Sequence, residues 1–252
     1  MGVKKQRRIS KSASVYVPVA VLLIVLLAVA GISVFFRVVD IEVTGASLYT
    51  KEEIVLASGI VMGDNMLFIK AGNILQKIYS AMPYISEASV EFLPPDIVRI
   101  NIVESVPMAS IRYPDGVLVI DSTCKILDKV DFVPAGLIEI KGFVPAGAVV
   151  GNALKADPGD DTRLKYIGEV LLAVEKEGIQ GGVSYIDVSS ISHVNFLYCN
   201  QFTVVLGTTD NIQYKMSILD EFIASRDMES SKDETGTIDM SIRGQWRFTP
   251  DR

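Results

Sequence analysis

The chain has 252 residues, of which 49% are apolar and 21% are charged, and its formal net charge is −6. Six of its 24 Lys and Arg residues, but none of its 30 Asp and Glu residues, lie within the first 37 positions, so the remainder has 18 basic against 30 acidic residues, a net charge of −12. A surface with this much negative charge repels the phosphates of nucleic acids and of anionic lipids. The composition therefore argues against nucleic acid binding and against membrane binding through a basic surface.

The N-terminus combines a basic tail with a long apolar segment. Five cations lie within residues 1–14, and residues 15–36 then carry no charge. As a helix, 22 residues measure about 33 Å, close to the roughly 30 Å of a bilayer's hydrocarbon core. We therefore predict a transmembrane helix over residues 15–36. Because cationic flanks stay in the cytoplasm, we expect residues 1–14 to be cytoplasmic and the rest to be exported.

A cleaved signal peptide is the alternative, because Ala28-Val29-Ala30 resembles a cleavage site of small residues. The apolar stretch runs on for six residues past Ala30, however, and it is longer than the usual signal-peptide core of about 7–15 residues. A retained anchor is therefore favoured over cleavage.

Residues 37–106 predict a compact α+β module. Thr50 and Glu53 form a capping box that begins a short helix, which Gly59 ends, and a second helix is expected over residues 71–82. Strand-like alternation appears at three places, which are Val39, Ile41 and Val43; Ala88, Val90 and Phe92; and Val98, Ile100 and Ile102. The predicted order is strand, helix, helix, strand, strand.

Residues 107–252 predict a second, strand-rich α+β domain. We expect Asp161 and Asp210 to cap two helices, and residues 144–160 to form a loop. Strands are predicted over residues 117–121, 126–127, 137–141, 185–188, 194–199, 202–207 and 237–242.

An ordered set of short motifs carries a family resemblance. They are residues 36–45 (FRVVDIEVTG), 63–66 (GDNM), 82–90 (MPYISEASV), 94–100 (PPDIVRI) and 104–109 (ESVPMA), and later Tyr185-Ile186-Asp187, Leu206-Gly207, Lys215 and Ile238-Asp239-Met240. Together they resemble the FtsQ/DivIB cell-division family, whose POTRA (polypeptide-transport-associated) domain follows a membrane helix directly and precedes a β domain. Ser105 departs from the pattern, since the family usually has a basic residue there.

The chain offers little catalytic chemistry. His193 is the only histidine and has no nucleophile motif near it. Carboxylate pairs such as Glu175 with Glu177, or Asp160 with Asp161, are better explained as solvated surface and capping residues. Cys124 and Cys199 lack metal-site spacing, and export permits a disulfide, but two buried free thiols are the simpler interpretation. We predict no catalytic, cofactor or metal site.

The alternating segment 237–242 is the most informative candidate site. Near the C-terminus of an open sheet we expect it to be an edge strand, whose backbone groups can bind an incoming peptide. The alternative is a plain closing strand. Trp246 and Phe248, just beyond it, either pack the base of the domain or anchor a partner.

The resemblance implies a non-enzymatic scaffold of the division machinery, located in the cell membrane at the septum. It implies binding outside the membrane to FtsL-like and FtsB/DivIC-like coiled-coil proteins, and through them regulation of the septal peptidoglycan synthase complex. The family's partner-binding strand maps onto Met240, Ser241, Ile242, Arg243 and Gly244, with Phe248 beyond it. Two alternatives remain, a secreted cell-wall enzyme released after Ala30 and a POTRA-bearing secretion or assembly component.

Overall fold

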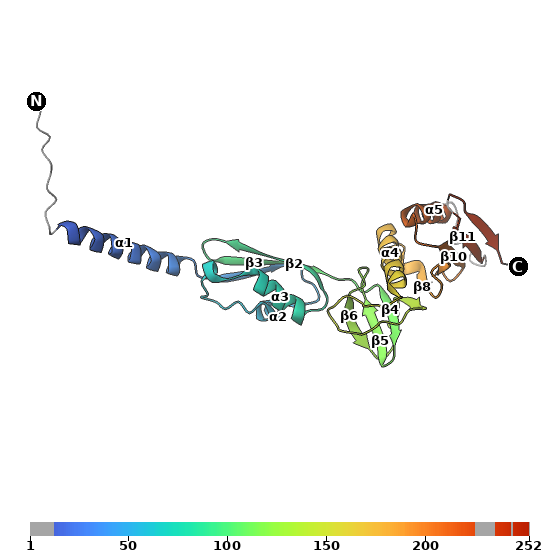
Figure 1. Ribbon diagram of the computed structural model, residues 1–252, viewed down its shortest axis with the longest axis horizontal. Helices are drawn as coiled ribbons and strands as arrows, with labels where there is room; N and C mark the ends of the chain where they lie inside the picture. Colours follow the sequence, from blue (N-terminus) through green and yellow to red (C-terminus); the bar gives the residue numbers. More distant parts are fainter. Residues whose placement is uncertain (1–12, 225–234, 243, 252) are drawn as a thin grey trace, which may run out of the picture. The chain divides into compact units, whose positions relative to one another are not determined.

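The computed structural model describes residues 13–224, 235–242 and 244–251 (Figure 1). The chain divides into two compact units, Met1–Ile78 with Glu87–Val103, and Tyr79–Ser86 with Glu104–Arg252. The architecture is α+β, as the sequence predicts. The domain bounds that we predict, residues 37–106 and 107–252, stay predictions.

Helix α1 (Ala13–Phe35) is the predicted apolar N-terminal helix. Its stretch Tyr16–Phe35 has 20 residues, and none of it is buried within the protein. A helix of that length measures about 30 Å, which matches the hydrocarbon core of a bilayer. The helix is therefore long and apolar enough to cross a membrane.

The first unit contains a three-stranded sheet in the order β1-β3-β2, in which β1 runs parallel to β3. Its elements are β1 (Asp40–Thr44), α2 (Lys51–Ser58), the short 3₁₀ helix η1 (Met66–Phe68), α3 (Ala71–Ala81), β2 (Ile85–Leu93) and β3 (Ile97–Glu104). Apart from η1, this is the predicted order of strand, helix, helix, strand, strand. Ile41, Ile54, Ile78 and Ile100 are buried, so one face of the sheet and both helices share a core.

Helix α2 begins and ends where its sequence requires. The Thr50 hydroxyl accepts the Glu53 backbone N–H (3.3 Å), and the Glu53 carboxylate accepts the Thr50 N–H (2.8 Å). This reciprocal capping lowers the pKa of Glu53 below its ordinary value. The helix ends at Gly59, whose φ of 68° lies in the left-handed region that glycine adopts readily.

The second unit is built on a nine-stranded sheet in the order β12-β11-β10-β9-β8-β7-β4-β5-β6. The strands are β4 (Ala109–Tyr113), β5 (Gly116–Ile120), β6 (Ile126–Val130), β7 (Ile138–Lys141), β8 (Val183–Asp187), β9 (Val194–Tyr198), β10 (Phe202–Gly207), β11 (Gly236–Asp239) and β12 (Arg247–Pro250). Strands β4 and β12 are absent from the sequence prediction. The helices are α4 (Asp161–Glu177), the 3₁₀ helix η2 (Gln180–Gly182) and α5 (Ile212–Ala224).

Two parallel strand pairs explain the positions of the helices. Strand β7 pairs parallel with β8 and β10 pairs parallel with β11, so the chain crosses over between the members of each pair, once through α4 and once through α5. The two helices contact one another (Figure 1). Met216, Leu219 and Phe222 of α5 belong to the same buried core as Phe202 and Ile238 of the sheet.

Both predicted aspartate caps are wrong. Asp161 is the first residue of α4, and Asp160 holds the cap position without a side-chain capping bond. The Asp160 carboxylate instead pairs with the Arg163 guanidinium. Helix α5 begins at Ile212, two residues after Asp210, whose carboxylate accepts the Thr208 hydroxyl (3.0 Å). The prediction for Asp161 thus fails because the helix begins one residue earlier than expected, and the prediction for Asp210 fails because α5 begins one residue later and Asp210 bonds Thr208 instead.

The predicted edge strand 237–242 also requires correction. Strand β11 ends at Asp239 and pairs on both sides, parallel with β10 and antiparallel with β12. The chain leaves the sheet because the Asp239 carboxylate accepts the Ser241 N–H (2.9 Å), and Gly244 has a φ of 73°. Within the part of the chain that the structure describes, the sheet does end in a C-terminal edge strand, but that strand is β12.

Candidate partner-binding site

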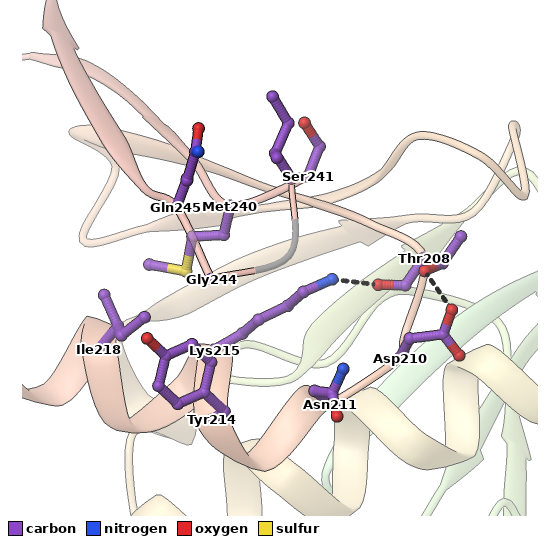
Figure 2. A pocket seen from close by; sticks show the side chains of 11 residues that line it. Thr208, Asp210, Asn211, Tyr214, Lys215, Ile218, Met240, Ser241, Gly244 and Gln245 are labelled. Carbon is purple, nitrogen blue, oxygen red and sulfur yellow. Dashed lines mark hydrogen bonds between the residues drawn. The ribbon is translucent and has the colours of Figure 1, made fainter.

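Four of the six residues predicted to bind a partner lie together in the connection from β11 to β12. Met240, Ser241, Ile242 and Gly244 line one cavity of about 360 Å³. Arg243 lies outside the described residues, and Phe248 lies on β12. Gln245, from the same connection, also lines the cavity, and the rest of its wall is formed by residues from the start of α5 and the segment before it, which are Thr208, Asp210, Asn211, Tyr214, Lys215 and Ile218 (Figure 2).

Lys215 forms the polar base of this cavity. Its side chain is buried, and its Nζ donates to the backbone oxygens of Leu206 (2.6 Å) and Thr208 (2.7 Å). Figure 2 shows the side chain extending from α5 toward Thr208. Burial lowers the pKa of Lys215, while the charge of Asp210 acts in the opposite direction. The ammonium group thus fastens the end of β10 to the first turn of α5.

Gly207 allows the segment after β11 to approach the end of β10. Its φ is 70°, and a Cβ at this position would lie 3.0 Å from the Cβ of Ser241 and 3.1 Å from its Cα. The β10–β9 pairing also shifts register between Val205 and Gly207. A side chain at position 207 would therefore both strain the backbone and displace Ser241.

The four cavity residues do not have equal access to a partner. The Met240 side chain is buried, and its N–H donates to the Val205 oxygen (2.8 Å), so Met240 is a core residue. Ser241 and Gly244 are exposed, and the Ile242 side chain is 63% exposed. The hydrogen bonds from Ser241 lower the pKa of Asp239, with smaller contributions from His193 and Arg247.

Phe248 packs into the domain's own aromatic cluster. Its ring centroid lies 5.5 Å from that of Phe222 and 6.0 Å from that of Phe202, and Trp246 lies 6.1 Å from Phe222. Phe248 is half-buried, whereas Trp246 is 50% exposed. The Phe248 ring therefore packs within the domain, which is one of the two roles considered for it. Trp246, for which the sequence leaves the same two roles open, is the more accessible aromatic side chain.

His193, the histidine considered for a catalytic triad, lies on the surface. His193 is exposed in the turn before β9, and its N–H donates to the Ser190 oxygen (3.1 Å). Among the residues described, no group of three or more His, Cys, Asp or Glu side chains is arranged to hold a metal. Cys124 and Cys199 are not bonded. The prediction of two buried thiols is right for Cys124, whose burial raises the pKa to about 12, and wrong for Cys199, which is exposed.

Comparison with known proteins gives one family. A family model described as "POTRA domain, FtsQ-type" matches residues 36–105. The cell division protein FtsQ of Corynebacterium glutamicum is 30% identical over 150 residues, which cover 55% of this chain and 67% of that protein. The cell division protein DivIB of Clostridium botulinum is 24% identical over 242 residues, covering 96% and 91%. FtsQ of Mycobacterium leprae is 28% identical over 176 residues, covering 70% and 47%.

These matches agree with the motifs and with the fold. The matched POTRA region begins at residue 36, directly after α1, and the alignment with DivIB extends through the strand-rich unit. The relatives are all named as cell division proteins. The chain therefore belongs to the FtsQ/DivIB family of cell division proteins.

Proposed function

We propose that this cell division protein is a non-enzymatic scaffold, anchored by α1, that binds FtsL-like and FtsB/DivIC-like coiled-coil proteins outside the membrane. Its basic N-terminus lies in the cytoplasm and both folded units lie outside, at the division septum. Binding positions and regulates the septal peptidoglycan synthase complex. The length and apolarity of α1 support the anchor, and the cations before it support the orientation.

The partner-binding part of the proposal is supported by the position of β12, which is the last strand of the sheet that the described residues form. A terminal strand can accept a further strand, and extended peptides bind many proteins by such addition. The opposite end of the sheet, β6, lies far from the residues that the family resemblance implicates. We therefore assign the partner's extended segment to the outer side of β12.

The side chains beside β12 support specificity for an amphipathic segment. Ile242, Gln245, Trp246, Asp239 and Arg247 line a second hollow of about 160 Å³ next to the larger cavity. Ile242 and Trp246 are exposed apolar groups, and tryptophan in particular frequently contributes much of the binding energy of an interface. In this arrangement the backbone of β12 supplies the register, while Ile242 and Trp246 supply contacts to the partner's side chains.

The test is capture of the intact protein from dividing cells, with its partners identified by mass spectrometry. We expect coiled-coil division proteins to be captured with the parent chain and to be lost with Thr249→Pro, which disrupts β12. Thr249→Ala, which keeps the backbone, is the matched control. Equal recovery with all three chains would contradict the assignment to β12.

A further inference from the structure

A cluster of exposed apolar side chains lies in the first unit, outside the partner-binding site. Val61, Met62, Leu67 and Phe68, which we call the apolar loop, are 62%, 58%, 57% and 80% exposed. They flank Gly63, Asp64 and Asn65 between α2 and α3. Water-exposed apolar groups gathered in one short segment indicate a surface that another apolar phase covers.

Backbone hydrogen bonds hold this loop at the end of α1. The Met66 N–H donates to the Phe36 oxygen (2.9 Å), the Val38 N–H donates to the Asp64 oxygen (2.9 Å), and the Gly63 N–H donates to the Val38 oxygen (2.8 Å). The Asn65 side-chain amide also donates to the Ser33 oxygen within α1 (3.1 Å). The loop is thus tied to residues on both sides of the helix end.

The length of α1 fixes where that end lies in a bilayer. The apolar stretch Tyr16–Phe35 spans about 30 Å as a helix, the full thickness of the hydrocarbon core. Phe35 therefore lies at the boundary between acyl chains and headgroups, and Phe36 to Val38 lie in the headgroup layer. Because the apolar loop is bonded to those residues, it lies in the same layer.

The chemistry of the segment suits an interface. Arg37 and Lys70 are exposed cations at its two sides, and such residues extend toward lipid phosphates at the membrane surface. The one acidic group within it, Asp64, uses its carboxylate to accept the Val61 N–H (3.0 Å). The net acidity of the exported part does not oppose this contact, since it depends on apolar side chains rather than on a basic surface.

We propose that the apolar loop inserts into the outer leaflet beside α1, as a second membrane contact that sets the orientation of the POTRA region relative to the bilayer. The inference rests on the proposed role of α1 as a membrane anchor. A single helix followed by a flexible joint would let the domain rotate freely. Insertion of Met62 and Phe68 on one side of the helix restricts that rotation.

The experiment uses tryptophan as a reporter in the full-length chain. Trp246 is the only tryptophan, so Trp246→Phe provides a background in which Phe68→Trp reports on the loop. Val103→Trp is the matched control, because Val103 is also exposed (54%) but lies away from the end of α1. It is six residues along β3 from Ile97, and Ile97 pairs with Asp40, just after α1. Six strand residues span about 20 Å. Met62→Trp is a second reporter, and circular dichroism checks the fold of each variant.

Each variant is reconstituted into vesicles of phosphatidylcholine and phosphatidylglycerol, with and without brominated acyl chains. We expect the emission of Phe68→Trp and Met62→Trp to shift to shorter wavelength and to lose most of its intensity in brominated vesicles, while Val103→Trp does neither. Flotation of the vesicles on a density gradient reports separately whether α1 anchors the chain.

If the protein floats with the vesicles but Phe68→Trp and Met62→Trp behave like Val103→Trp, the inference is overturned and the anchor stands. If the protein does not float, the anchor and the inference both fail. If the reporters become shielded only in vesicles prepared from native membranes, the loop binds a membrane protein, and its assignment to lipid is wrong.

Discussion

Gly236 and Phe248 meet across the last two strands of the sheet so closely that a Cβ on Gly236 would lie 2.6 Å from Cε2 of the Phe248 ring. The same Cβ would lie 2.7 Å from the Thr249 oxygen. The missing side chain thus creates the space into which Phe248 packs, and it lets β12 lie flat against β11. The position of the edge strand depends on this contact.

Gly236→Ala should therefore weaken the attachment of β12. Overpacking of this kind costs about 1–3 kcal/mol of unfolding free energy. Gly181→Ala is a suitable control, since no atom lies within 4 Å of a Cβ built there. Urea denaturation of the two variants measures the difference, and equal stability would show that β12 tolerates the displacement of Phe248.

Substitutions at Phe248 and Ile242 should separate folding from binding. Phe248→Ala removes a half-buried ring that contacts Phe202 and Phe222, so we expect a loss of about 1–3 kcal/mol of stability. Ile242→Ala removes an exposed side chain, so stability should change by less than about 0.5 kcal/mol. We expect Ile242→Ala nevertheless to weaken binding of the coiled-coil partner, measured by calorimetric titration. Unchanged affinity would exclude Ile242 from the interface.

Asp239 should make the end of β11 sensitive to acid. Hydrogen bonds from Ser241 hold its pKa below the ordinary value of 3.8, so the native state favours the charged carboxylate. Its stabilising contribution is present above pH 3.8 and is lost as the pH falls through the lower native pKa. The stability difference between the parent and Asp239→Asn should therefore shrink as the pH drops below 3.8. A constant difference in thermal denaturation across that range would contradict the effect of Ser241 on the carboxylate.

His193→Ala should leave division and growth unchanged. The residue lies in an exposed turn, and the sequence around it contains no nucleophile motif, so we expect no catalytic role. Complementation of a depletion strain is the measurement, with protein abundance checked by immunoblotting. A division defect in a stably folded His193→Ala chain would reopen the enzymatic alternative.

Local patterns in the sequence predict much of this fold. The alternation around Ile100 predicts β3, and the capping box of Thr50 and Glu53 predicts the start of α2. Both patterns involve only residues close in sequence, so they can be recognised without the tertiary structure. Strand β10 has the predicted bounds, because its apolar run ends at a glycine in the left-handed conformation. The capping prediction for Asp161 is wrong because Asp161 is already the first residue of α4, and the one for Asp210 is wrong because α5 begins at Ile212 and the Asp210 carboxylate accepts the Thr208 hydroxyl.

The site was harder to predict than the fold. The family resemblance places Met240 among the partner-binding residues, and the alternation of Ile238 and Met240 agrees with a strand there, but β11 ends at Asp239 and the Met240 side chain is buried. Strand β12 has four residues and a single half-buried side chain, Phe248, between polar neighbours. Such a segment shows little periodicity, and its pairing with β11 depends on the turn at Gly244. The one sequence feature that points to β12 is the isolated aromatic residue Phe248 before Thr249-Pro250.

Binding of a partner segment along β12 requires that β12 stay paired with β11, and Thr249 lies within that pairing. Thr249 pairs with Thr237 in the antiparallel ladder of β12 and β11. Two residues along this ladder, the Asp251 N–H donates to the Thr235 oxygen (2.9 Å). Because such bonds recur at every second residue of an antiparallel pair, the Thr249 N–H also points toward β11. Thr249→Pro deletes that donor and detaches β12, whereas Thr249→Ala truncates only an exposed side chain.

The measurement is titration of residues 37–252 of each chain, the part that we propose to be exported, with the corresponding segment of the coiled-coil partner, with circular dichroism confirming that the remaining fold is intact. We predict that Thr249→Pro abolishes binding and that Thr249→Ala binds nearly as tightly as the parent. If Thr249→Pro binds like the parent, the interface lies elsewhere and the assignment to β12 is wrong.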